Sequence, residues 1–232
     1  MKLALMQPYF FPYLGYFSLL AAVDRFVFYD EVQWIKNGWV NRNRVLVGGA
    51  TSYLTVPVRD AGPSRTIAEV EVAKDAGWRR KMFEMVRHAY RKAPYFAPVH
   101  DLLQQAVPEA QPHVSAMAKA SVRLVAGYLA LPVELVDDPG RQGEPGLIGP
   151  ERVLGVCRDE KATAYWNLPG GKALYDAERF QAAGVALRFV EPVLEPYPQF
   201  AAAFVPGLSM LDVLMHNSPQ EARRMAEAGV PA

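Results

Sequence analysis

The residues with the clearest chemical potential form a tyrosine-rich segment near the N-terminus, Gln7-Pro8-Tyr9-Phe10-Phe11-Pro12-Tyr13-Leu14-Gly15-Tyr16. Two prolines four residues apart predict an extended loop after the apolar run at residues 2–6. A loop at the carboxyl end of the first strand of an open α/β sheet is a usual place for a ligand, and the helix N-terminus that follows offers N–H groups to an anion. We therefore expect ligand contacts from Gln7, Tyr9, Tyr13, Gly15 and Tyr16, although an aromatic core would use similar residues.

The placement of Tyr13, Gly15 and Tyr16 is similar to that of the H-x-G-H signature of nucleotidylyltransferases and class I synthetases, whose histidines hold nucleotide phosphates. Here tyrosine stands at both histidine positions. A phenol donates a hydrogen bond to a phosphate but carries no imidazolium charge. The downstream lysine-rich signature of those enzymes is not visible either, so this similarity concerns the fold more than adenylation chemistry.

A second polar group follows the next apolar run, at residues 25–29. Asp30 is expected at the carboxyl end of that strand, beside the tyrosine-rich loop, and is our candidate for a general base. Arg42 and Arg44 alternate, so both face one side of an extended strand, where two guanidinium groups suit a phosphate or a carboxylate. An ordinary polar sheet face would show the same pattern. The expected ligand-binding residues of this group are Gln33, Lys36, Asn41, Arg42 and Arg44.

A third group, Asn167-Leu168-Pro169-Gly170-Gly171-Lys172, lies between an expected strand and an expected helix. Its glycines would let the backbone approach a ligand closely, so Asn167, Gly170, Gly171 and Lys172 are further binding candidates. The alternative for Lys172 is an ion pair with Asp176, one helical turn later.

Two residues near other helix starts complete the candidates. Arg152 is a candidate anion ligand at the start of a helix. Asp212 is expected to be structural, in a capping box with Ser209.

Other common catalytic signatures are missing. The four histidines have no metal-ligand spacing, so no metal site is expected, and Cys157 lies in a helical pattern typical of a buried, inert thiol. No nucleophile elbow is present. The sequence identifies no cofactor.

The elements that must position these groups begin with strand, loop, helix and strand within thirty residues, which is the outline of a right-handed βαβ unit. Asn-Gly at 37–38 and Gly-Gly at 48–49 predict two hairpins, over residues 32–41 and 45–56. Helices are expected over 78–92, 99–106 and 113–129, followed by a strand at 133–136 and a Gly/Pro-rich loop at 137–150. Helices at 151–158 and 172–183 then alternate with strands at 162–166 and 185–190, which predicts that the C-terminal part rejoins the first sheet or builds a small second one.

Composition adds few constraints on partners. The 232 residues are 51% apolar and 21% charged with a formal net charge of +1, typical of an ordinary globular protein without a general attraction to nucleic acid. We expect neither a signal peptide nor a membrane-spanning helix, and hence a cytoplasmic protein.

A local basic surface is nevertheless expected on the helix at 78–92. Its outer face carries six cations against one carboxylate, and such a face could bind the backbone of a nucleic acid such as tRNA. A solvated helix face is the simpler alternative. The cations are Arg79, Arg80, Lys81, Arg87, Arg91 and Lys92.

Taken together, several motifs resemble the WbqC-like family, over nearly the whole chain. They are the tyrosine-rich segment at 6–17, Tyr29-Asp30-Glu31-Val32-Gln33-Trp34, the segment at 38–44, Tyr165-Trp166-Asn167-Leu168-Pro169-Gly170-Gly171, the segment at 174–176 and Leu208-Ser209-Met210-Leu211-Asp212. The resemblance implies a place in O-antigen, lipopolysaccharide or other surface-polysaccharide biosynthesis more directly than it implies a reaction. The loop at 137–150 departs from the family because it lacks the serines expected there.

We therefore predict an α/β protein with a Rossmann-like N-terminal βαβ unit, a helical middle segment and a C-terminal βα portion, divided as 1–72, 73–130 and 131–232 or integrated as one domain. The expected function is group transfer on an activated, anion-bearing small molecule: a nucleotide, a nucleotide-amino sugar, or an acyl or aminoacyl donor. The alternatives are an aminoacyl-tRNA-dependent transferase and a non-catalytic sugar-nucleotide binding or scaffold protein.

Overall fold

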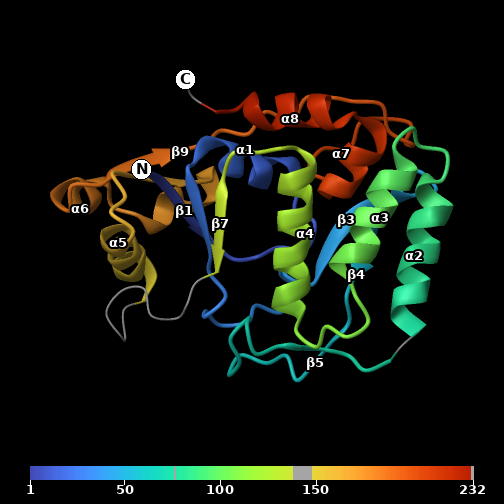
Figure 1. Ribbon diagram of the computed structural model, residues 1–232, viewed down its shortest axis with the longest axis horizontal. Coiled ribbons are helices and arrows are strands. Elements are labelled where there is room, and N and C mark those ends of the chain that lie inside the picture. Colours follow the sequence, from blue (N-terminus) through green and yellow to red (C-terminus); the bar gives the residue numbers. More distant parts are fainter. Residues whose placement is uncertain (76, 138–147, 231–232) are drawn as a thin grey trace.

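A five-stranded parallel sheet forms the centre of the protein, seen in a computed structural model that describes residues 1–75, 77–137 and 148–230 (Figure 1). Its strands run in the order β7-β2-β1-β8-β9. They are β1 (Lys2–Met6), β2 (Arg25–Phe28), β7 (Glu134–Asp137), β8 (Ala164–Asn167) and β9 (Ala186–Phe189). The predicted Rossmann-like α/β class is confirmed, and the C-terminal strands rejoin the first sheet.

The N-terminal βαβ unit is built as the sequence predicts. Helix α1 (Leu14–Ala22) connects β1 to β2, and the two strands pair in parallel from Leu3 opposite Arg25 to Met6 opposite Phe28. The chain then adds β7 beyond β2, and later places β8 and β9 on the opposite side of β1. The strand order therefore reverses between β1 and β8.

Alternating side chains of the strands enter two different cores, because successive residues of a strand face opposite sides of the sheet. Leu3, Leu5 and Val27 pack with α5 (Gly149–Asp159) and with Phe180 of α6 (Ala177–Ala182). Ala4 and Phe28 belong to the larger core on the other face. Figure 1 shows α5 and α6 together at one end of the molecule and α2 and α3 at the other.

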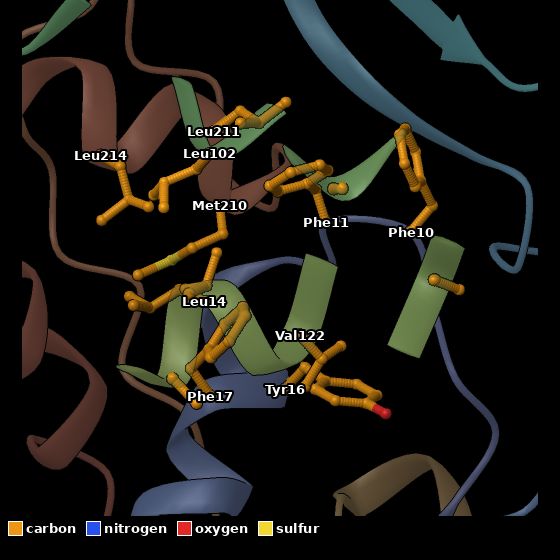
Figure 2. Packing of buried hydrophobic residues seen from close by; sticks show 14 of the residues in the cluster. Phe10, Phe11, Leu14, Tyr16, Phe17, Leu102, Val122, Met210, Leu211 and Leu214 are labelled. Carbon is orange, nitrogen blue, oxygen red and sulfur yellow. The ribbon is translucent and has the colours of Figure 1, made fainter. Parts of the chain in front are cut away.

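The larger core is made mainly by side chains from helices. Figure 2 shows part of it, where Phe11, Leu14 and Phe17 gather with Leu102, Met210 and Leu214. The helices that contribute to it besides α1 are α2 (Gly77–Tyr90), α3 (Phe96–Ala106), α4 (Val114–Tyr128), α7 (Met210–His216) and α8 (Pro219–Glu227). Among the described residues, no helix is long and apolar enough to cross a membrane.

One predicted hairpin is confirmed and the other is wrong. Strands β3 (Arg42–Val47) and β4 (Ala50–Thr55) pair across Gly48 and Gly49, whose φ values of 60° and 81° fit a tight hairpin turn. Asn37 also has positive φ, and the N–H of Gly38 bonds to the carbonyl of Ile35, but no strands flank this turn. The residues on either side of the turn bond to other parts of the chain instead. The N–H of Trp34 donates to the carbonyl of Arg65, and the carbonyl of Trp39 accepts from the N–H of Phe10.

The predicted helix at 172–183 is interrupted. A 3-10 helix, Pro169–Leu174, is followed by a break and then by α6. Asp176 has extended backbone angles and caps α6 by accepting a hydrogen bond from the N–H of Glu178 at 2.9 Å. The ion pair considered between Lys172 and Asp176 is replaced by one between Lys172 Nζ and Glu191 at 2.6 Å.

The short strands β5 (Val58–Arg59) and β6 (Glu71–Val72) were not predicted. Helix α7 begins where a helix start was expected, but its capping differs. Ser209 does cap α7, accepting from the N–H of Leu211. The capping box is not completed, because the N–H of Ser209 donates to the carbonyl of Arg44. The buried carboxylate of Asp212 instead accepts from the hydroxyls of Tyr90 and Tyr197 at 2.7 and 2.8 Å.

The loop between β1 and α1 is held by three polar side chains from distant parts of the chain. Phe11 has a φ of 39°, which is unusual for a bulky residue. Its N–H donates to Ser121 Oγ at 2.9 Å, and its carbonyl accepts from Ser209 Oγ at 2.7 Å. Asn43 Nδ2 donates to the carbonyls of both Phe10 and Phe11, at 3.1 and 2.9 Å. Strands and helices far apart in sequence thus fix this backbone conformation.

Replacing Asn43 by Ala should therefore destabilise the protein strongly. The substitution leaves two buried carbonyls without this donor beside a strained residue, at a cost of about 2–3 kcal/mol. Urea denaturation followed by circular dichroism would measure the change. Asn41→Ala is the matched control, because Asn41 Nδ2 makes a single hydrogen bond, to the carbonyl of Val56. An equal or larger loss in the control would contradict the role given to Asn43.

Candidate functional site

A cavity of about 880 Å³ opens at the carboxyl ends of β1 and β8, where the strand order reverses. In open α/β sheets this position is where ligands bind, because the connections leave the two strands in opposite directions and part there. The floor is formed by Met6 and Gln7 after β1 and by Asn167 and Leu168 at the end of β8.

Aromatic side chains form much of the wall. They come from the loop after β1, the end of β2, the segment before β3 and the segment before α6: Tyr9, Tyr13, Tyr29, Trp39 and Tyr175. Burial raises the pKa of Tyr9, Tyr13 and Tyr175. These phenols are therefore protonated at neutral pH and can donate hydrogen bonds, while their rings offer flat apolar surfaces.

Gly15 allows Tyr13 to lie over the first turn of α1. A Cβ at Gly15 would stand 2.5 Å from Tyr13 Cε2 and 2.6 Å from its hydroxyl oxygen. The ring of Tyr13 lines the cavity, so the missing side chain at Gly15 sets the position of one cavity wall.

Arg44 is the one cationic side chain among the described residues that line the cavity. One Nη donates to the carbonyl of Gly207 at 3.1 Å, and the guanidinium lies 5.8 Å from the ring centre of Trp39. Its Nε is buried and has no partner among the described residues. The hydrogen bond to Gly207 and the contact with Trp39 thus hold this positive charge at the cavity wall.

Three helical elements begin at the cavity without a side-chain cap. They are α1, preceded by Tyr13, α5, which starts at Gly149, and the 3-10 helix, preceded by Leu168. Such first turns carry a partial positive charge, which favours anions, and two of their N–H groups already bond to the chain, that of Tyr16 to the carbonyl of Tyr13 and that of Gly171 to the carbonyl of Leu168. No carboxylate, imidazole or thiol belongs to the described cavity lining, so a bound anion would meet no opposing charge there.

Asn167 organises the β8 side of the cavity. Its Nδ2 lies 3.1 Å from the hydroxyl of Tyr165 and 3.3 Å from that of Tyr175, while its Oδ1 accepts from the N–H of Leu168 at 2.7 Å. A Cβ at Gly171 would lie 2.9 Å from this Nδ2. Gly171 is therefore needed for the close packing of Asn167. A Cβ at Gly170, in contrast, would meet no atom within 4 Å.

The cavity brings together part of the predicted site. Residues from all three sequence groups line it, namely Gln7, Tyr9, Tyr13, Arg44, Asn167, Gly170 and Gly171. Gly15 supports it from behind Tyr13. Their roles in ligand binding stay predictions.

Other predicted residues lie outside the lining. Tyr16 is fully buried and donates to the carbonyl of Gln7 at 2.9 Å. Arg42 donates to the carbonyl of Asn37 at 2.6 Å and stacks on Tyr53. Lys36 is exposed.

The remaining four residues have contacts elsewhere. Gln33 Nε2 donates to the carbonyl of Pro63, and Asn41 Nδ2 to that of Val56. Arg152 lies over the ring of Tyr29, and Lys172 pairs with Glu191.

Asp30, the candidate general base, faces away from the cavity. Its side chain is 5% exposed, pairs with Lys119 Nζ at 2.7 Å and accepts a hydrogen bond from Ser115, both on α4. Lys119 also pairs with Asp137 at the end of β7, at 2.9 Å. This geometry joins α4 to two strands of the sheet, so Asp30 has a structural task there.

The sequence reasoning missed several cavity residues. Tyr29, Trp39 and Tyr175 lie within or beside motifs that were singled out, but their side-chain directions depend on long-range packing. Asn43 lies between the two predicted arginines on β3. Because side chains alternate along a strand, its place in the sequence indicates only that it points to the other side of β3 from Arg42 and Arg44. Gly207 carried no sequence signal.

The described residues contain no cluster of three or more His, Cys, Asp or Glu side chains able to hold a metal ion. Cys157 is buried, and burial raises the pKa of its thiol to about 12.

Comparisons with known proteins agree with the motifs described above. The chain is 26% identical over 217 residues to the uncharacterized protein Rv1507c of Mycobacterium tuberculosis (strain ATCC 25618 / H37Rv), an alignment that covers 93% of each chain. No solved structure matches the chain. The model of the WbqC-like protein family matches residues 7–224, which include every strand of the sheet except β1. The protein therefore belongs to the WbqC-like protein family.

Proposed function

We propose that this protein is a cytoplasmic group-transfer enzyme that binds an activated, phosphate-bearing donor in surface-polysaccharide or related sugar metabolism. One observation carries the proposal: three uncapped helix starts and Arg44 border a cavity whose described lining has no carboxylate. This arrangement favours a ligand with negative charge, such as a phosphate or a diphosphate.

The rest of the cavity suits the remainder of such a donor. A volume of about 880 Å³ is large enough for a nucleotide sugar, and ligand sites of this size are mainly apolar with a few placed polar groups. Trp39 and the tyrosine rings offer faces for a base or a sugar ring. The protonated phenols supply hydrogen bonds for hydroxyl or acetamido groups.

The same charges would promote transfer. When the bond between a sugar carbon and its phosphate oxygen breaks, the electron pair and the negative charge go to the departing phosphate. Fixed donors aimed at that charge stabilise the transition state more than the ground state. Arg44 and the helix N-termini would fill this role, and the acceptor hydroxyl would lose its proton to the departing phosphate or to water.

A non-catalytic sugar-nucleotide binding protein is the second candidate. It is favoured by the lack of a carboxylate, imidazole or thiol in the described lining, because such groups usually perform proton transfer. Binding without turnover, on a panel of nucleotide-amino sugars with candidate acceptors, would support this alternative and contradict the enzyme.

The donor class can be identified by thermal unfolding with nucleotides, nucleotide-amino sugars, ATP with and without magnesium, acyl-CoA and bulk tRNA. A ligand present at about 100 times its Kd adds about 2.7 kcal/mol to the free energy of unfolding, and a domain of this size should then gain several degrees in Tm. A shift with acyl-CoA alone would replace the sugar donor by an acyl donor. If none of the phosphate-bearing molecules shifts Tm, the proposed function is wrong.

Arg44→Ala should weaken binding of the ligand found in that panel by about 10- to 100-fold, because a charge-assisted hydrogen bond is worth roughly 1.5–3 kcal/mol. Isothermal titration calorimetry would measure the change. Arg42→Ala is the matched control, since Arg42 lies on the same strand and faces the same side but does not line the cavity. Equal losses in the two variants would refute the assignment of Arg44.

Gly15→Ala should reduce ligand affinity while leaving Tm within a few degrees of the parent. The new Cβ collides with the far end of the Tyr13 side chain, so the ring swings into the cavity and the backbone stays in place. Alanine also raises helix propensity, which offsets the lost packing.

Gly127→Ala in α4 serves as the control for Gly15→Ala, because its Cβ would meet no atom within 4 Å. It should stabilise the helix slightly and leave ligand binding unchanged. Unchanged binding in Gly15→Ala would show that Tyr13 does not shape the ligand site.

A further inference from the structure

The cations of α2 are not equivalent. Arg79 donates to the carbonyls of Val107 and Pro108 and lies over the ring of Trp78. Arg80 forms an ion pair with Glu84 on the same helix, with 4.0 Å between Arg80 Nε and Glu84 Oε1. Arg87 in the last turn of α2, and Arg91 and Lys92 directly after its end, are exposed and have no ion-pair partner among the described residues. Lys81, near the start of the helix, is exposed as well, so the cations at the C-terminal end are set apart by their surroundings and not by their number.

A second hollow, of about 370 Å³, lies at this end of α2. Its titratable lining groups are all basic: His88, Arg91 and Lys92. The hairpin turn Gly48-Gly49 and the side chain of Phe200 close the other sides. Phe200 is 41% exposed, so part of its ring is available to a ligand.

The glycine turn leaves this hollow open. Both glycines have positive φ, and a Cβ at Gly48 would meet no atom within 4 Å. No described residue accepts a hydrogen bond from the amide of Gly48 or Gly49. The turn therefore contributes backbone without side chains, and its amides remain available as donors.

Basic residues at a helix C-terminus are common because they interact favourably with the helix dipole. The dipole accounts for the charges but does not require a hollow, a bare glycine turn or an exposed aromatic ring beside them. The buried carboxylate of Asp212, which accepts from Tyr90 at the end of α2, is already satisfied by Tyr90, Tyr197 and Gln199 Nε2. Its partners are neutral hydroxyl and amide groups, and among the described residues it forms no ion pair with the surface cations.

We propose that this hollow is a second binding site, which takes a nucleotide unit through its phosphate and its base. Arg91, Lys92 and the turn amides would hold the phosphate, and the base would stack on Phe200. Stacking on an aromatic ring beside a cationic groove is how proteins bind single-stranded nucleic acids. Arg87 lies outside the hollow on the same helix end and would reach a neighbouring phosphate, so an RNA strand fits better than a free nucleotide.

Fluorescence anisotropy with a labelled single-stranded RNA of about ten nucleotides would test this site. The double variant Arg91→Ala/Lys92→Ala should bind roughly tenfold or more weakly at low salt. The slope of log affinity against log salt should also become shallower by up to about 2. Phe200→Leu should cost roughly fivefold or more. Thermal unfolding would verify that each variant is folded.

Two controls test whether the hollow itself, rather than the charge of the helix or the first cavity, binds the RNA. Arg80→Ala/Lys81→Ala removes the same charge from α2 outside the hollow and should change affinity by less than about twofold. Arg44→Ala should leave RNA binding intact, so failure of the first cavity and failure of this site are distinguishable. Equal losses in the two charge pairs would mean attraction by the helix charge alone and would overturn the proposal.

Adding AMP to the Arg44→Ala variant tests whether the hollow takes an RNA strand or a free nucleotide. Binding of RNA with weak competition by AMP supports a site for a strand. Saturable AMP binding without RNA binding, lost in Arg91→Ala/Lys92→Ala, supports the same site for a free nucleotide. If neither probe binds, or if binding is insensitive to Arg91, Lys92 and Phe200, the proposal is wrong.

Discussion

The candidate site depends on one local constraint, the hydrogen bonds that hold the backbone of Phe10 and Phe11. Asn43 from β3, Ser121 from α4 and Ser209 at the start of α7 all bond to this short stretch. A bulky residue at positive φ persists only when its surroundings fix it, at a cost of about 1–3 kcal/mol. The strained turn lets Phe11 enter the core and leads the chain on to Tyr13 at the cavity wall.

Strand β3 couples this constraint to the charge of the site. Asn43 bonds to the loop through its amide, and both it and the next residue, Arg44, border the cavity. The carbonyl of Arg44 also accepts from the N–H of Ser209, which in turn donates through its hydroxyl to Phe11. The backbone segments that carry the aromatic wall and the cation therefore share one hydrogen-bonded support.

Local patterns predicted the elements but not every side-chain direction. The apolar runs and Gly48-Gly49 gave β1, β2 and the β3–β4 hairpin, because burial and turn geometry are encoded over a few residues. Asp30 was expected beside the tyrosine-rich loop because it follows β2. Successive residues face opposite sides, however, so Tyr29 lines the cavity while Asp30 meets Lys119 on α4. Which face α4 covers is decided by packing across about ninety residues of chain, beyond the range of local periodicity.

The β3–β4 hairpin also relates the two proposed ligand sites. Arg44 lines the first cavity, and Leu46, Gly48 and Gly49 line the second hollow. Four residues of an extended strand separate Arg44 from Gly48, which corresponds to about 13 Å. A polynucleotide held at the end of α2 would thus have its neighbouring units within reach of the cavity. This proximity would allow an activated group carried on RNA to enter the same cavity as a small phosphate-bearing donor. A nucleotide-sugar donor alone gives no reason for a basic hollow at the far end of the hairpin.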